Sequence, residues 1–135
     1  MFVGLLRVLD EGAPIHPHQD VLRRDAKTAI NAYSLKTQLA ANIYLNMPQE
    51  GGELQLWEHG CSDEEYKNLL TPGEYYVERS KLVAPFLTIK PEVGELVLFN
   101  PTRYHAVTPG KGTKRVSVSC FVCYRGEYCP LTLWS

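Results

Sequence analysis

Residues 95–124 form the stretch ELVLFNPTRYHAVTPGKGTKRVSVSCFVCY, and this stretch decides the class of the fold. Its two ends, 95–99 and 115–124, are rich in β-branched and aromatic residues and predict two strands. The segment between them, 100–112, contains two prolines and two glycines, a composition typical of turns. Two strong strands joined by a connection of this kind indicate a β protein.

The rest of the chain repeats the pattern of short apolar runs between turn signals. Further strands are expected at residues 2–9, 15–21, 39–46, 53–58 and 86–90. Residues 48–52 are expected to close a hairpin between LAANIYLN and ELQLWE. About seven or eight short strands with little helix predict a mainly β sandwich or jelly roll.

Helix is expected in one place. SDEEYKNLL, residues 62–70, begins with a Ser-x-x-Glu capping box and predicts a short helix. The polar segment 23–34 is consistent with either a loop or a second short helix. The chain shows no repeat and no linker, so residues 1–135 are expected to form one domain.

Composition excludes several classes of partner. Apolar residues make up 44% of the chain, charged residues 21%, and the formal net charge is −1, so we expect no nucleic-acid surface. No apolar run approaches the roughly 20 residues that span a bilayer, so no membrane contact is expected. The first residues lack the features of a signal peptide, which favours a cytoplasmic location.

The four cysteines support that location. Cys120 and Cys123 lie in an expected strand, and their spacing places them on opposite faces. The residues between them make a poor turn for a zinc knuckle, and no second CxxC pair is present. Reduced thiols are therefore expected.

The residues that carry chemistry begin with His18 and Asp20. Their spacing of two places both side chains on one face of a strand. His105, after the strand at 95–99, is the candidate third ligand. Two histidines and one carboxylate leave metal positions open for a co-substrate and O₂, an arrangement that suits iron(II). A His-x-Asp pair alone is more often a surface pair, and His16 offers a competing His-x-His arrangement.

Arg115 and Ser117 add a second element. Arg115 lies ten residues after His105, and Ser117 shares its face on the expected strand. A guanidinium can bond both oxygens of a carboxylate, and the hydroxyl can add a further hydrogen bond. The alternative is a surface arginine on an edge strand, which the apolar run that follows disfavours.

The chain resembles the 2-oxoglutarate/Fe(II) oxygenase superfamily, with its double-stranded β-helix core. The resemblance lies in five motifs in this order: His18-x-Asp20, LAANIYLN, GGELQLW, GELVLFNPTRYHAVTP and Arg115-x-Ser117. The resemblance covers nearly the whole chain. It is closest to prolyl-4-hydroxylase-like members. More narrowly, GGEL, LFNPTRYH and the final LWS resemble alkaloid-tailoring hydroxylases and halogenases of the welwitindolinone halogenase type.

The resemblance implies a role for each matching residue. His18, Asp20 and His105 match the iron ligands, and Arg115 with Ser117 matches the site for the distal carboxylate of 2-oxoglutarate. Tyr44 matches a strand position that gives a phenol to the same carboxylate, and Asn42 would point into the pocket near the metal. Both could instead belong to a polar strand face.

The resemblance also implies the reaction. Fe(II), 2-oxoglutarate and O₂ would oxidise a C–H bond of a small molecule, with succinate and CO₂ as products and ascorbate as a candidate reductant. Halogenases carry a small residue at the carboxylate position. Asp20 therefore favours hydroxylation or a related oxidation.

Two further expectations follow. Members of this type carry about a hundred residues before the first core strand, so we expect a homodimer or a partner to cover apolar residues near the start of this chain. The main competing hypothesis is a non-catalytic, cupin-like module that binds a metal or a partner. Cupins need no arginine and serine at positions 115 and 117.

Overall fold

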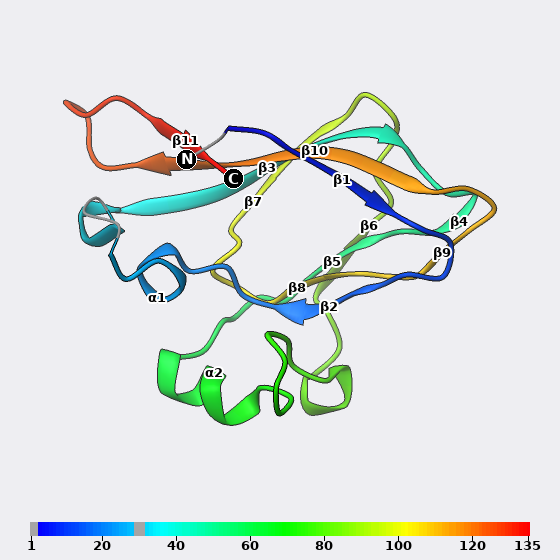
Figure 1. Ribbon diagram of the computed structural model, residues 1–135, viewed down its shortest axis with the longest axis horizontal. Coiled ribbons are helices and arrows are strands. Elements are labelled where there is room, and N and C mark those ends of the chain that lie inside the picture. The colour runs from blue at the N-terminus through cyan, green and yellow to red at the C-terminus, as the bar shows by residue number, and fades with distance from the viewer. Residues whose placement is uncertain (1–2, 29–31) are drawn as a thin grey trace.

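The computed structural model describes residues 3–28 and 32–135, and it forms two antiparallel sheets that face each other (Figure 1). The first sheet has the order β1-β10-β3-β7, formed by Leu5–Leu9, Arg115–Tyr124, Thr37–Asn46 and Leu96–Phe99. The second has the order β2-β8-β5-β6, formed by Ile15–His18, His105–Val107, Leu54–Leu56 and Leu87–Ile89. The chain alternates between these two sheets, and this arrangement is a jelly roll. The expected mainly β fold is confirmed.

Three smaller strand segments remain: β11 (Thr132–Trp134) is a fifth strand of the first sheet, and β4 (Glu50–Gly51) and β9 (Gly110–Lys111) form a separate two-stranded sheet. β11 pairs with the C-terminal half of β10. The β4–β9 pair needs glycine, because a Cβ at Gly51 would lie 1.9 Å from the carbonyl oxygen of Pro109 and the residue has φ +69°.

The core between the sheets is small. Ala40 of β3, Phe99 of β7 and Leu54 of β5 form a buried cluster, packed against half-buried Leu56 and Phe121. Alternation along β3 and β10 sends every second side chain to this interior. The same interior face carries the polar residues of the site, so core and site share one layer.

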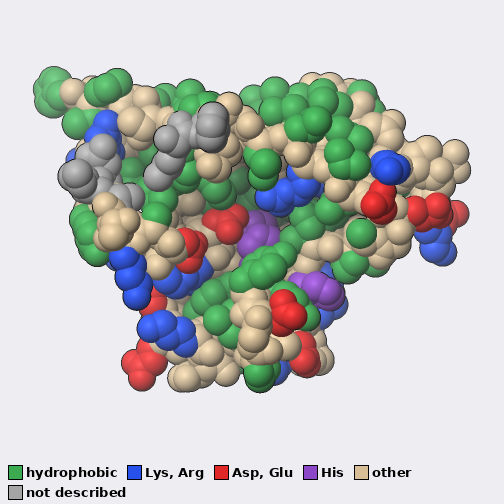
Figure 2. All heavy atoms as spheres, in the orientation of Figure 1, with side chains coloured by type: hydrophobic (Ala, Val, Ile, Leu, Met, Phe, Trp, Pro, Cys, Tyr) green, Lys and Arg blue, Asp and Glu red, His purple; other side chains and the backbone are tan. Residues whose placement is uncertain are grey.

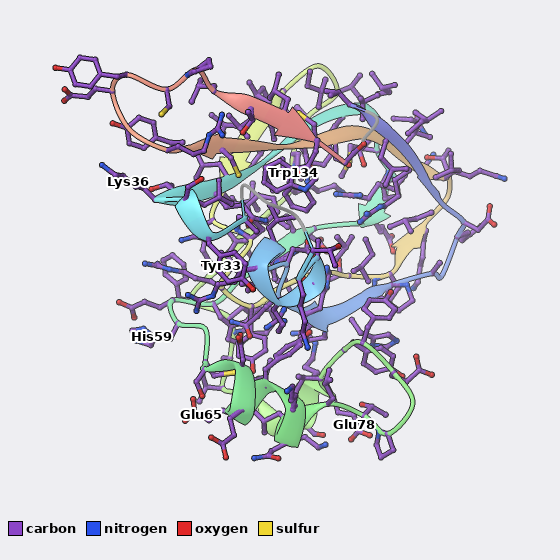
Figure 3. The ribbon with its side chains drawn as sticks, turned by 60° about the vertical axis from the view of Figure 1, so that its left-hand side comes forward. Tyr33, Lys36, His59, Glu65, Glu78 and Trp134 are labelled. Atoms are coloured by element: carbon purple, nitrogen blue, oxygen red, sulfur yellow. The ribbon has the colours of Figure 1, made fainter. Side chains whose placement is uncertain are left out.

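A second cluster covers the outer face of the second sheet. Helix α2 (Asp63–Leu69) and the loop after it contribute Tyr66 and Val77, which pack against Trp57, Tyr104 and Ala106. The predicted capping box is confirmed. The Ser62 hydroxyl accepts from the backbone N–H of Glu65, and the Glu65 carboxylate accepts from the backbone N–H of Ser62. In Figure 3, Glu65 lies on this helix and projects outward.

The remaining helical turns are short. They are α1 (Leu22–Asp25), η1 (Ala32–Ser34) and η2 (Arg79–Lys81). Helix α1 falls in the segment for which the sequence left loop and helix open. Among residues 3–28 and 32–135, no helix is long and apolar enough to cross a membrane. Phe2, the first residue of the first expected strand, lies outside the described residues.

The predicted hairpin at 48–52 is wrong. β3 and β5 lie in different sheets, and the residues between them turn the chain from one sheet to the other through the β4–β9 pair. Hairpin turns and connections between two sheets are both rich in Pro, Gly and polar residues, so the composition of 48–52 does not distinguish the two. Strands β4, β8, β9 and β11 were also not predicted, and each is only two or three residues long.

Candidate metal centre

Three side chains from two neighbouring strands and the loop after one of them converge at one end of the second sheet. β2 pairs with β8 so that His18 lies opposite His105, and the two ring centroids are 4.2 Å apart. The Oδ2 atom of Asp20 lies 3.8 Å from Nε2 of His18 and 3.4 Å from Nε2 of His105. One ligand atom from each of the three residues falls within 4.8 Å of the others, a spacing that a single ion can bridge.

The tautomers of both histidines are fixed by the backbone. Nδ1 of His18 lies 2.8 Å from the carbonyl oxygen of His16, and Nδ1 of His105 lies 3.1 Å from that of Arg103. A carbonyl oxygen can only accept, so each Nδ1 carries the hydrogen and each Nε2 presents its lone pair. Two lone pairs and a carboxylate oxygen therefore face one another, an arrangement that a cation stabilises.

The protonation states agree with this arrangement. Burial, followed by the nearby His105, lowers the pKa of His18 to about 4, so its imidazole is neutral at pH 7. Burial tends to raise the pKa of Asp20, but hydrogen bonding and charge from His105 hold it below its ordinary value. Asp20 therefore supplies a negative charge beside the neutral imidazole of His18.

Backbone contacts with the β7–β8 loop hold the ligands in place. Strand β2 ends at His18, so the expected placement of Asp20 on the strand itself does not hold. The backbone N–H of Asp20 donates to the carbonyl of Pro101 (2.9 Å), and the side chain of Gln19 donates to that of Thr102 (2.6 Å). This loop leads directly into His105, so the two ligand-bearing segments are tied together.

A cavity runs from these ligands into the space between the sheets. Its lining includes all three candidate ligands together with Asn42, Arg115 and Ser117. The space between these residues, with its opening to solvent included, is about 610 Å³. Figure 2 shows a histidine near the centre of one face of the molecule, with acidic side chains to its left and basic side chains to its upper right.

Arg115 is buried in this cavity wall without a carboxylate partner. Its side chain is on β10, is 4% exposed, and forms no ion pair with any described residue. Nη1 donates to the Ser117 hydroxyl at 3.5 Å, while Nε has no hydrogen-bond partner in the described chain. A buried guanidinium is costly unless an anion is paired with it, so this position calls for one.

Tyr44 lies beside Arg115 on the neighbouring strand. Ser117 and Tyr44 are directly paired between β10 and β3, and the Arg115 guanidinium carbon lies 5.0 Å from the centre of the Tyr44 ring. The Tyr44 hydroxyl is fully buried and has no hydrogen-bond partner among the described residues. Burial raises the pKa of this phenol, so it is present as a hydroxyl that can donate.

The structure places the other histidines outside the ligand cluster. His16 is exposed and stacks on Tyr76, with ring centroids 4.3 Å apart. His59, labelled in Figure 3, projects outward near Glu58, and its side chain is 84% exposed. The competing His-x-His arrangement is therefore not formed.

Sequence reasoning missed one charged residue of the cavity. Arg7 of β1 lies opposite Ser117 and lines the same cavity. In the sequence, Arg7 lies within the apolar run 2–9. Side chains alternate between the two faces of a strand, so Arg7 lies on the face opposite to its neighbours Leu6 and Val8.

Comparison with known proteins identifies the family. The sequence model of the 2OG-Fe(II) oxygenase superfamily matches residues 3–123. The chain belongs to this superfamily. The competing cupin-like interpretation is disfavoured by this match, which extends over both strands of the ligand pair and over β10.

Two curated relatives match almost all of this chain. The L-γ-glutamyl-L-propargylglycine hydroxylase of Streptantibioticus cattleyicolor is 33% identical over 139 residues, which cover 99% of this chain and 48% of the relative. The leucinostatins biosynthesis cluster protein S of Purpureocillium lilacinum is 28% identical over 149 residues, which cover 99% of this chain and 58% of the relative. The chain thus spans about half the length of these relatives.

Solved structures show the same fold. An N-substituted L-amino acid dioxygenase from Burkholderia ambifaria AMMD superposes with a TM-score of 0.69 at 21% identity, covering 98% of this chain and 53% of that chain. A second structure of that enzyme, in complex with alpha-KG, superposes with a TM-score of 0.65. At this identity the likeness supports the jelly roll alone.

Proposed function

We propose that this chain is the catalytic core of an Fe(II)- and 2-oxoglutarate-dependent dioxygenase that hydroxylates, or otherwise oxidises, an unactivated C–H bond of a small molecule. The observation that carries the proposal is the buried, unpaired Arg115 in the same cavity as the His18, Asp20 and His105 cluster. A metal-binding cluster alone fits many functions. A metal-binding cluster with a buried cation across one small cavity fits a dicarboxylate that bridges the two.

The iron ligands in this proposal are His18, Asp20 and His105. Two neutral imidazole nitrogens and one carboxylate suit iron(II), and a facial set of three leaves positions for other ligands. The carbonyl contacts of each Nδ1 atom fix the direction of the ligating nitrogen before a metal binds.

The site of 2-oxoglutarate is proposed at Arg115, Ser117 and Tyr44. The guanidinium would bond the distal carboxylate, and the two hydroxyls would donate to it. Such a carboxylate would give partners to the two buried atoms that have none, Arg115 Nε and the Tyr44 hydroxyl. Asn42 lies in the cavity lining nearer to the ligands and is proposed to contact the bound co-substrate.

With O₂, iron and 2-oxoglutarate supply an oxidant able to take hydrogen from a C–H bond, and 2-oxoglutarate is converted to succinate and CO₂. The protein positions these components and excludes water. Leu54 and Phe99 form the apolar wall of the cavity between the ligands and the first sheet. Asp20 fills the third ligand position, which favours hydroxylation over halogenation.

The names of the relatives suggest the class of substrate. The bacterial relative hydroxylates a γ-glutamyl dipeptide, and the structurally similar dioxygenase acts on N-substituted L-amino acids. We infer that the substrate here is a small amino-acid derivative. We also propose that residues 1–135 act as one oxygenase core, and a cytoplasmic location stays a prediction of the sequence.

Succinate formation tests the proposal. Purified chain, Fe(II), 2-oxoglutarate and ascorbate are mixed in air, with and without a panel of γ-glutamyl and N-acyl amino acids, and succinate is measured. We expect slow succinate formation alone and faster formation with an accepted panel member, both abolished in His105→Ala. Folded, iron-loaded protein that forms no succinate under any of these conditions would contradict the proposal.

A further inference from the structure

A second arginine faces the cavity and is not used by the proposed iron and 2-oxoglutarate sites. Arg7 lies on β1 directly opposite Ser117, in the row that continues to Tyr44 on β3. Side chains paired directly in an antiparallel sheet lie on the same face. Arg7 therefore points to the interior side of the sheet, and it lines the cavity with the three candidate iron ligands.

Arg7 differs from Arg115 in its exposure. Arg115 is buried, whereas Arg7 is exposed on the first strand of the sheet. Arg7 forms no ion pair with an aspartate or glutamate side chain in residues 3–28 or 32–135. An exposed guanidinium beside the cavity can meet a ligand that enters from solvent.

The charge of Arg7 acts on its neighbour Arg115. Burial lowers the pKa of the Arg115 guanidinium, and the like charge of Arg7 acts in the same direction.

The proposed iron and 2-oxoglutarate sites do not use Arg7. Iron(II) and Asp20 together carry one positive charge, Arg115 carries another, and the two carboxylates of 2-oxoglutarate cancel both. Arg7 is then the remaining basic side chain in the cavity lining. A carboxylate of the substrate would complement its charge.

We propose that Arg7 is a specificity-determining residue that binds a carboxylate of the substrate, so that the enzyme accepts acids and discriminates against their amides. This inference rests on the proposed function and narrows its substrate class to carboxylate-bearing molecules. The guanidinium would hold the acid end of the substrate at the mouth of the cavity and direct the rest of the molecule towards the metal centre.

Binding without turnover tests the inference. Protein loaded with Mn(II) and 2-oxoglutarate is titrated calorimetrically with two pairs of compounds, each an acid and its amide. The pairs are N-acetyl-L-leucine with N-acetyl-L-leucinamide, and L-γ-glutamyl-L-propargylglycine with its C-terminal amide. For at least one pair we expect the acid to bind about tenfold or more tightly than the amide, and Arg7→Gln to remove that difference. Lys36→Gln, which makes the same charge change at an exposed site away from this cavity, should leave it intact.

Two results would overturn the inference. One is the absence of an acid preference in every pair with the wild-type protein. The other is an acid preference that Arg7→Gln leaves unchanged; if that variant also lost 2-oxoglutarate affinity, Arg7 would be assigned to the co-substrate. Circular dichroism confirms that Arg7→Gln is folded. Failure of the wild-type protein to bind 2-oxoglutarate at all would instead count against the proposed function.

Discussion

The guanidinium carbon of Arg115 lies 5.0 Å from the centre of the Tyr44 ring, and each of these side chains keeps one buried polar atom without a hydrogen-bond partner in the described chain. Native proteins rarely leave buried donors unpaired, because each costs about 1–3 kcal/mol. Two such donors side by side, one of them charged, mark a place where a ligand anion completes the structure.

Arg115→Ala should weaken 2-oxoglutarate binding strongly. The loss of one partner of a buried charge pair typically costs about 2–5 kcal/mol, which corresponds to a loss of about 30-fold or more in affinity. Calorimetric titration of Mn(II)-loaded protein with 2-oxoglutarate measures it. Arg115→Lys keeps the charge but not the planar fork, and should recover part of the affinity. Equal affinity in wild type and Arg115→Ala would remove Arg115 from the site.

Tyr44→Phe should weaken 2-oxoglutarate binding without lowering the stability of the ligand-free protein. Because the Tyr44 hydroxyl has no partner, its removal should leave the free energy of unfolding of the ligand-free protein unchanged or raise it by up to about 1 kcal/mol. The same change should lower 2-oxoglutarate affinity by about tenfold. Urea unfolding and calorimetry measure the two effects.

Tyr66→Phe is the matched control for that experiment. The Tyr66 hydroxyl donates to the carbonyl of Tyr75 (2.8 Å) and accepts from the backbone N–H of Gln19. Its removal should cost about 1–2 kcal/mol of stability, with smaller effects on 2-oxoglutarate affinity. If Tyr44→Phe destabilised the ligand-free protein as much as Tyr66→Phe does, the Tyr44 hydroxyl would have a structural partner and no ligand role.

Thiol labelling tests the interior face of β10. Burial raises the pKa of Cys123 to about 11, so at pH 8 almost none of it is thiolate, whereas Cys129 is exposed. A thiol reagent should therefore modify Cys129 quickly and Cys123 only after unfolding. Mass spectrometry of quenched samples identifies the modified residue, and Cys129→Ser should remove its fast phase. Rapid modification of Cys123 in native protein would contradict the register of β10.

The outer face of the first sheet predicts self-association. One continuous row of paired residues crosses β1, β10, β3 and β7 and consists of Leu6, Val118, Ile43 and Leu96. Leu6 is 59% exposed, Ile43 42% and Leu96 56%. An apolar row of this length favours a covering partner, and a second copy of the chain can supply one. Sedimentation velocity should show species heavier than 15.3 kDa as concentration rises.

A double variant tests that surface. Leu6→Lys with Leu96→Glu should shift the protein towards monomer, because a charge then stands at each end of the apolar row. Leu131→Lys changes an equally exposed leucine outside the row and should have little effect. Wild-type protein that stays monomeric at every concentration, or a double variant that associates as before, would show that this face is not the interface.

The sequence predicted the site better than the connections of the fold. His18, Asp20 and His105 come together in the structure, and Arg115 lies across the same cavity, because few residue types can bind a metal or a carboxylate. Strands β3, β7 and β10 were predictable from their runs of apolar, β-branched and aromatic residues. The role of each site residue stays a proposal until metal and 2-oxoglutarate binding are measured.

The failures of prediction have physical causes. β8 consists of three residues, all buried, so the two-residue alternation that marks a half-buried strand is absent. The segment at 48–52 turns the chain between two sheets, and turn composition does not reveal which strands a turn connects. Arg7 was missed because a single arginine in an apolar run indicates a surface position, and only the pairing of β1 with β10 shows that it faces the cavity.

The most direct test of the account is an anaerobic titration followed by visible absorption. Fe(II) is added to the metal-free protein, and then 2-oxoglutarate. We predict a charge-transfer band that saturates at one 2-oxoglutarate per iron, is lost in His105→Ala, and requires much more 2-oxoglutarate in Arg115→Ala. Folded wild-type protein that binds iron but develops no band, or a band that is undiminished in His105→Ala, would contradict the proposed site.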